Sequence, residues 1–208
     1  MYQFVAAGLS NSEAPAMPNA KITEKQVDIA FAEMLIGNEP FRDWVLSGSK
    51  FAHLRPDLRL LTEELSKSRR MPANSWRHVW CVMPDGTEGE TDIFMVFEAS
   101  DGYRFALHFE NKPPHGVLRP NQGEAYAKRA EFLSGHPRYL SYQGWETAII
   151  APQAFIHRHA DRCRPFDRTI TYEAIADWIP LFGQSLNGVG ASPQPAVTTG
   201  ASLLSLPS

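Results

Sequence analysis

Apolar residues recur at two different periods along this chain, and each period indicates one kind of secondary structure. Val27, Phe31 and Leu35 return at helical spacing after Thr23, a residue type that favours a helix start, and Gly37 ends the pattern. The same spacing predicts four more helices, over residues 40–46, 58–70, 121–134 and 170–179.

Elsewhere, short apolar runs rich in aromatic and β-branched residues indicate strands. Two Asp-Gly pairs, Asp85-Gly86 and Asp101-Gly102, have the chemistry of tight turns and separate three of these runs. Strands are therefore expected over residues 76–83, 91–98, 103–111 and 147–151. Helices, a three-strand meander, a helix, a strand and a closing helix predict a mixed α/β fold, in which a central sheet packs against helices.

The length and composition fit one globular domain with a tail at each end. The chain has 208 residues, 43% of them hydrophobic, which is enough for a single core. Residues 1–20 carry Glu13 as their one charge, and residues 181–208 carry none. We expect both segments to be flexible tails around a domain over residues 21–180.

The charge and cysteine content exclude several classes of protein. No apolar run is long enough for a transmembrane helix, and a net charge of -3 excludes a broadly basic surface. The N-terminal segment has no Lys or Arg before Lys21, unlike a signal peptide, and two cysteines do not make a disulfide framework. We therefore expect a cytoplasmic protein with no membrane partner.

The strand over residues 103–111 carries the first candidate functional residues. Because strand side chains alternate between faces, Glu110 and Lys112 point the same way, about 7 Å apart. If the preceding turn is centred on Asp101, opposite positions sum to 202 and Asp92 lies across from Glu110. This register requires an odd-numbered loop with Gly102 in a left-handed conformation.

An Asp and a Glu that converge in this way repel each other unless a positive charge lies between them. Carboxylate oxygens are hard ligands that suit Mg²⁺ or Mn²⁺. A Lys beside such a site can orient a water molecule and stabilise the negative charge that develops on a phosphate. Asp92, Glu110 and Lys112 therefore have the chemistry required to hydrolyse a phosphodiester.

This pattern resembles the signature of the PD-(D/E)XK nuclease superfamily. Asp92 followed by Glu110-Asn111-Lys112 resembles the metal-site motif, and Gln122 with Tyr126 resembles the QxxxY helix motif of its RecB-type nucleases. The wider stretch FENKPPHGVLRPNQGEAY resembles the ENK and Gln pattern of a bacterial group in that superfamily. The resemblance covers roughly residues 22–180 and implies a restriction-endonuclease-like fold, a mixed central sheet flanked by helices.

The resemblance also implies roles for individual residues. Asp92 and Glu110 would bind the metal, and Lys112 would position or activate the attacking water. Gln122 and Tyr126 would support the site or contact the nucleic-acid backbone.

The family also places a Glu on the first helix beside the metal. Glu24 and Glu33 are the candidates. At 100° per residue, Glu24 falls between Phe31 and Leu35 on the apolar face and Glu33 falls on the far side, so Glu24 is preferred. Asp28 lies one turn further along and can line the same cleft. His108 is expected to be a core histidine.

The charge distribution indicates where a nucleic acid would lie. The acidic segment over residues 79–126 is flanked by basic segments over residues 42–77 and 127–168, an arrangement that suits a metal site holding a phosphate chain. The candidate phosphate contacts are two adjacent basic pairs, Arg69-Arg70 and Lys128-Arg129.

The expected function is thus a nuclease dependent on Mg²⁺ or Mn²⁺, with DNA preferred over RNA as substrate. The wider group implies a role in bacterial defence or mobile elements. The alternative is a non-catalytic nucleic-acid-binding or assembly module on the same fold. The sequence does not distinguish endonuclease from exonuclease action, and it leaves a homodimer or a separate specificity partner open.

Overall fold

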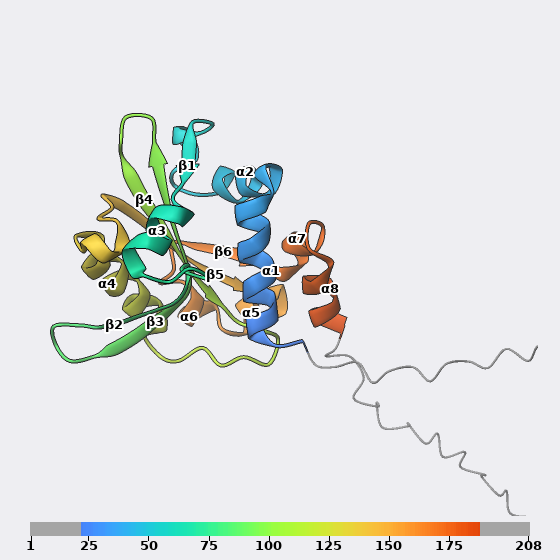
Figure 1. Ribbon diagram of the computed structural model, residues 1–208. Coiled ribbons are helices and arrows are strands. Elements are labelled where there is room, and N and C mark those ends of the chain that lie inside the picture. The colour runs from blue at the N-terminus through green and yellow to red at the C-terminus, as the bar shows by residue number, and fades with distance from the viewer. Residues whose placement is uncertain (1–21, 188–208) are drawn as a thin grey trace, which may run out of the picture.

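The computed structural model describes residues 22–187, and these form one sheet between two layers of helices (Figure 1). The strands are β1 (Leu58–Leu60), β2 (Arg77–Val82), β3 (Glu88–Ala99), β4 (Arg104–Asn111), β5 (Gly144–Ala151) and β6 (Arg168–Thr171). The α-helices are α1 (Glu24–Gly37), α2 (Glu39–Ser47), α3 (Thr62–Arg69), α4 (Gln122–Ser134), α5 (Gln153–Arg158), α6 (Ala160–Cys163), α7 (Tyr172–Ala176) and α8 (Pro180–Asn187). Two 3₁₀ turns, η1 (Ala52–Leu54) and η2 (Pro137–Tyr139), complete the described part of the chain.

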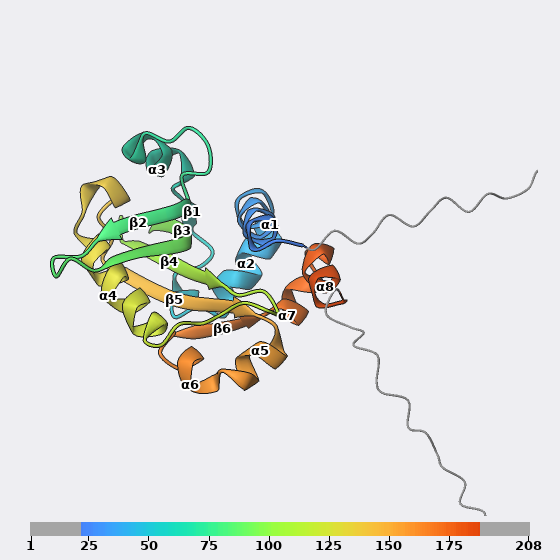
Figure 2. The ribbon, with the colours of Figure 1, turned by 90° about the horizontal axis from the view of Figure 1, so that it is seen from below.

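The sheet is mixed, with an antiparallel half and a parallel half. Its order is β1-β3-β4-β5-β6, and β2 pairs with β3 as well. The long strand β3 pairs with β1 near its end and with β2 near its start, so both short strands lie along one edge of β3. The pairs β4–β5 and β5–β6 are parallel, and α4 and the α5–α6 segment make the two crossovers (Figure 2). The mixed α/β sheet flanked by helices is confirmed.

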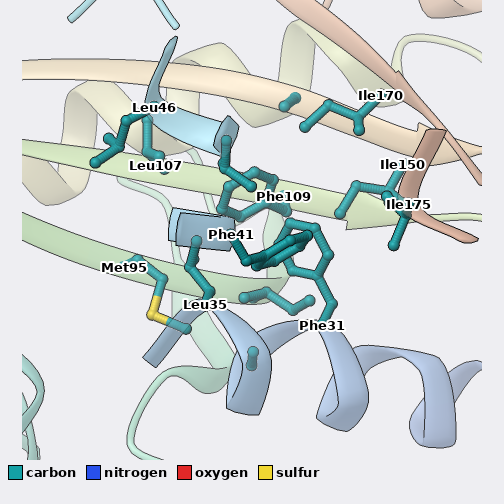
Figure 3. Packing of buried hydrophobic residues seen from close by; sticks show 14 of the residues in the cluster. Phe31, Leu35, Phe41, Leu46, Met95, Leu107, Phe109, Ile150, Ile170 and Ile175 are labelled. Atoms are coloured by element: carbon teal, nitrogen blue, oxygen red, sulfur yellow. The ribbon is translucent and has the colours of Figure 1, made fainter. Parts of the chain in front are cut away.

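Each face of the sheet is covered by its own set of helices. The helices α1, α2, α7 and α8 cover one face, where Phe31, Phe41 and Phe109 meet edge to face with ring centroids 5.2–5.5 Å apart (Figure 3). The helices α3, α4, α5 and α6 cover the other face. We call these the α1 side and the α4 side. None of the helices within residues 22–187 has the length and apolar character needed to cross a bilayer.

The predicted register of the β3–β4 hairpin is confirmed. Ile93 pairs with Phe109 and Phe94 pairs with His108, so opposite positions sum to 202 as expected. Gly102 has a φ of +85°, the left-handed conformation that a three-residue loop with a bulge requires. The turn therefore sets which residues of the two strands lie opposite each other.

Two predicted helices contain strands. The segment over residues 58–70 begins with β1 and becomes helical only at Thr62, because Leu58 to Leu60 extend the edge of β3. The segment over residues 170–179 likewise begins with the end of β6, and α7 starts at Tyr172. The short helices α5 and α6 were not predicted.

The domain extends beyond its predicted boundary at residue 180. Pro180–Asn187 forms helix α8, and its Phe182 side chain is fully buried against Phe31 and Tyr172. The prediction of a tail from residue 181 is therefore wrong as far as Asn187. The rest of that predicted tail and the predicted N-terminal tail lie outside the described residues.

Candidate active site

Asp92 lies where strand β3 changes the faces to which its side chains point. In a regular strand Thr91 and Ile93 would point to the same side. Ile93 instead packs on the α1 side, whereas the Thr91 hydroxyl lies 3.4 Å from His108 Nδ1 on the α4 side. The carboxylate of Asp92 therefore lies between the two layers of helices.

In the neighbouring strand β2, the faces to which the side chains point also change, at the position beside Asp92. Arg77 reaches towards α1, whereas Val79 packs on the α4 side, although the two positions are only two residues apart. His78 lies between them with a φ of +48°, and no ladder pair joins it to Asp92 within the described sheet. The left-handed residue therefore explains the reversal, because it rotates the chain between the two flanking side chains.

Helix α4 supports the site from one side. Gln122 Nε2 donates a 2.6 Å hydrogen bond to Glu110 Oε1, and the Lys112 ammonium forms an ion pair with the same oxygen. The hydroxyl of Tyr126 accepts a 3.3 Å hydrogen bond from the Asp92 backbone N–H. All five residues proposed for the catalytic site thus meet in one place.

Helices α1 and α7 support the site from the other side, through Asn111. The Asn111 amide donates 2.7 Å to Asp28 Oδ1 and accepts 2.6 Å from the Tyr172 hydroxyl. Its backbone N–H donates 3.0 Å to Asp92 Oδ2. Arg77 pairs with the other oxygen of Asp28 at 3.5 Å. Asn111 therefore joins Asp28, Asp92 and Tyr172 in one buried network.

The carboxyl groups of Asp92 and Asp28 are hard to ionise. Burial raises the pKa of Asp92 from 3.8 to about 8, and the charges of Glu110 and Asp28 add to the effect. Burial likewise raises the pKa of Asp28 to about 6, although its hydrogen bond from Asn111 acts in the opposite direction. Burial would lower the pKa of Lys112, but Glu110 and the other carboxylates outweigh it, so its pKa is raised and it stays protonated.

Of the two glutamates considered on the first helix, Glu24 lies near this site, as expected, and Glu33 is exposed to solvent. Burial raises the pKa of Glu24, while Lys112 lowers it and Glu110 raises it, which places Glu24 within electrostatic range of both. Asp28 has a more direct role than the sequence indicated, because it alone on α1 hydrogen-bonds to β4 in this network.

The donor set has the chemistry that a hard divalent cation requires. Asp92, Glu110 and Glu24 offer carboxylate oxygens, and burial raises the pKa of Asp92 and of Glu24 because it makes their ionised forms costly, a cost that a nearby cation would offset. Within residues 22–187, no group of three or more His, Cys, Asp or Glu side chains is already arranged around a metal position. Lys112 provides the positive charge on Glu110 in this conformation.

Two of the four predicted phosphate contacts are buried. Arg129 packs its guanidinium 4.4 Å from the ring centre of Tyr126 and donates to the Thr91 hydroxyl at 3.2 Å. Arg69 is 6% exposed and donates to backbone carbonyls near the start of β2. Both side chains hold the fold together, so the prediction of direct phosphate contact is wrong for them.

The other two predicted contacts, Arg70 and Lys128, are exposed. Lys128 acts electrostatically on Asp85 at the β2–β3 turn, whereas Arg70 ends helix α3.

Sequence reasoning missed Asn111, Tyr172 and Arg77. Asn111 was named only as the middle residue of the Glu110-Asn111-Lys112 motif, and Tyr172 fell inside a predicted helix without a role. His108 is the core histidine that was expected: it is fully buried, its Nε2 lies 3.0 Å from the Tyr142 hydroxyl, and burial lowers its pKa to about 3.

The site thus combines buried carboxylates, one buried ammonium and four neutral hydrogen-bonding side chains, those of Asn111, Gln122, Tyr126 and Tyr172. Such an arrangement can bind a cation and can stabilise charge that develops on a bound phosphate. Comparisons of the chain with protein-family models, curated proteins and solved structures found no match.

Proposed function

We propose that this protein is a divalent-metal-dependent nuclease that hydrolyses phosphodiester bonds, with DNA as the preferred substrate. The observation that carries the proposal is the convergence of Asp92, Glu110 and Lys112 where β3 and β4 lie side by side, with Gln122 bonded to Glu110. Buried titratable groups that cluster in this way, with the pKa of Asp92 and that of Lys112 both raised, are frequent at functional sites.

We further infer that the fold is restriction-endonuclease-like and that the chain is a PD-(D/E)XK protein. The order α1, the meander β2–β3–β4, the crossover helix α4 and the parallel strand β5 supports this inference. So does the placement of Glu24 on the first helix and of Gln122 and Tyr126 on the crossover helix.

The residues have separable roles in the proposed reaction. Asp92 and Glu110 would hold Mg²⁺ or Mn²⁺ with help from Glu24, and the cation would polarise a phosphate oxygen and lower the pKa of water. Lys112 orients the attacking water and stabilises negative charge on the phosphate. Gln122 fixes the orientation of Glu110.

Water then adds to phosphorus, and one P–O ester bond breaks. The products are a phosphate monoester and a free hydroxyl. One proton of the water passes to the leaving oxygen, directly or through solvent, so the step needs no further reagent.

The test is cleavage of supercoiled plasmid and of a linear single strand with Mg²⁺, Mn²⁺ or EDTA. We expect cleavage that requires the metal and that falls at least about 100-fold in Lys112→Ala, because one charged stabilising group is lost. The control Lys67→Ala removes an exposed lysine whose charge Glu63 already partners at 3.7 Å, and it should cleave like the wild type.

Equal activity of Lys112→Ala and the wild type would reject this site. Binding of DNA without cleavage under any metal would favour the non-catalytic module. Plasmid nicking would identify an endonuclease, whereas shortening of linear strands alone would identify an exonuclease.

A further inference from the structure

A hollow of about 490 Å³ lies between the end of α3 and the turn η2, on the α4 side of β2. Its lining residues are Ser68, Arg69, Arg70, Pro137 and Arg138. Three of the five are arginines and none is acidic. Within the part of the chain that the structure describes, none of the three arginines forms an ion pair.

Arg69 places a fixed positive charge at the wall of this hollow. Its terminal nitrogens donate to the carbonyls of Ser75, Arg77 and His78, which are neutral acceptors. Its Nε is buried and has no hydrogen-bond partner among the described residues. A guanidinium this deeply buried without a carboxylate leaves its charge uncompensated.

The other two arginines add to this charge. Burial lowers the pKa of Arg69, the Tyr139 ring system opposes the shift, and the nearby charge of Arg138 lowers it further. Arg70 is exposed and follows α3 with a φ of +56°. Like charges gathered in this way repel one another, so an anion between them would stabilise the folded chain.

The two walls of the hollow are held at a fixed separation. The Ser68 hydroxyl donates a 3.0 Å hydrogen bond to the Pro137 carbonyl and so ties the end of α3 to η2. The hollow is therefore formed before any ligand arrives, which lowers the entropy lost on binding.

The hollow is also linked to the candidate active site through β2. Arg69 holds the carbonyls of Arg77 and His78, while the Arg77 side chain pairs with Asp28 and His78 lies at the level of Asp92. The backbone carbonyls of these two β2 residues thus bond to Arg69, which lines the hollow, and the same two residues lie beside the carboxylate site.

We propose that this hollow binds a phosphate group of a nucleic-acid strand at a distance from the bond being cut, which rests on the proposed nuclease function. Arginine is suited to this task because its planar fork matches two phosphate oxygens. Arg70 and Arg138 supply the donors, and Arg69 supplies the fixed charge behind them.

The test measures binding without cleavage, by anisotropy of a short labelled DNA duplex in EDTA over a series of salt concentrations. Loss of one phosphate contact should lower the slope of log affinity against log salt by about 0.9 and should weaken binding. We expect this change in Arg70→Gln and in Arg138→Gln. Lys67→Gln removes one charge from the same helix, one already partnered by Glu63, and should keep the wild-type slope.

A second arm titrates inorganic phosphate alone and follows the NMR signals of the arginine side chains. Phosphate and duplex binding that both depend on Arg138 would support the proposal. Phosphate binding with duplex affinity unchanged in both variants would overturn it and identify a site for a free phosphate. Wild-type duplex affinity and salt slope in both variants, with no phosphate response, would also overturn it.

The two proposals fail separately. If the protein binds the duplex through Arg138 but cuts no DNA, the proposed phosphate site stands and the proposed nuclease function is rejected. If the protein cuts DNA and Arg138→Gln binds the duplex as tightly as the wild type, the proposed nuclease function stands and the proposed phosphate site is rejected.

Discussion

At the scale of single residues, Asp92 shows the conflict between stability and chemistry most clearly. Its carboxyl group is buried beside Glu110 and Asp28, and its pKa lies near 8 instead of 3.8. The folded state therefore favours the protonated form, whereas a cation site requires the ionised form. Such sites weaken the fold in exchange for reactivity.

The pH dependence of stability follows from that shift. A carboxyl whose pKa is raised on folding contributes stability below about pH 4, and this contribution is lost as the pH rises towards 8. In EDTA, we expect the wild type to lose stability between pH 5 and pH 8 and Asp92→Asn to lose less. At pH 8 the variant should be more stable by at least about 1 kcal/mol, roughly 2–4 °C in unfolding temperature.

Thermal unfolding at the two pH values measures this difference. The control Asp57→Asn changes an exposed carboxyl in the same way and should follow the wild type. If the unfolding temperatures of all three proteins change with pH in the same way, the raised pKa assigned to Asp92 is contradicted.

The convergence of Asp92 and Glu110 could be predicted because it depends on local rules. Side-chain alternation and the loop at Gly102 fix which residues of the two strands lie opposite each other. The network through Asn111 could not be predicted, because Asp28 and Tyr172 reach it only after distant helices have packed on the sheet. Charge alone likewise did not show that Arg69 and Arg129 are buried.

At the scale of elements, helix α4 is positioned by close contact at its first turn. A Cβ at Gly123 would lie 2.8 Å from Pro165 Cβ and 3.2 Å from the ring of Phe166. The neighbouring Gln122 reaches Glu110, so the packing of this turn determines whether the helix can support the site.

Substitution at this contact should therefore affect both stability and activity. We expect Gly123→Ala to cost about 1–3 kcal/mol by overpacking and to reduce metal-dependent cleavage. Gly135→Ala at the other end of α4 is the matched control, because a Cβ there has no neighbour within 4 Å. Urea unfolding of both variants measures the costs, and equal costs would contradict the tight contact at Gly123.

Helices and strands were predicted well where the apolar residues follow either the helical or the strand spacing, and poorly where a strand runs directly into a helix. Helix α1 was recognised because its apolar spacing, its Thr23 cap and its end agree. Strand β6 was missed because it is only four residues long and runs directly into the helical pattern of Ile175 and Ile179, while its role as a strand depends on pairing with β5. Sequence period alone cannot supply that long-range pairing.

At the scale of the whole molecule, the C-terminal helix α8 completes the core of the α1 side. Phe182 is fully buried, with its ring centroid 4.7 Å from that of Tyr172 and 6.4 Å from that of Phe31. Tyr172 also holds Asn111, so the helix that completes the core packs directly on a residue that supports the site.

Removing this side chain should destabilise the whole domain. Phe182→Ala should cost about 3–5 kcal/mol in the free energy of unfolding, as for other buried phenylalanines. Phe132→Ala makes the same substitution at a residue that is 36% exposed and should cost far less. Denaturant titration compares the two, and a cost below about 1 kcal/mol at Phe182 would contradict the assigned boundary of the domain.

The network around Asn111 has a consequence for the order in which the site is completed during synthesis. Asn111 is held by Asp28, 83 positions earlier, and by Tyr172, 61 positions later. Chains leave the ribosome N-terminal end first, so Asp92, Glu110 and Lys112 emerge well before Tyr172 can close the network. An unfinished chain carries the proposed catalytic side chains without the hydroxyl that holds Asn111 against Asp92. Full activity would then belong only to chains translated past α7.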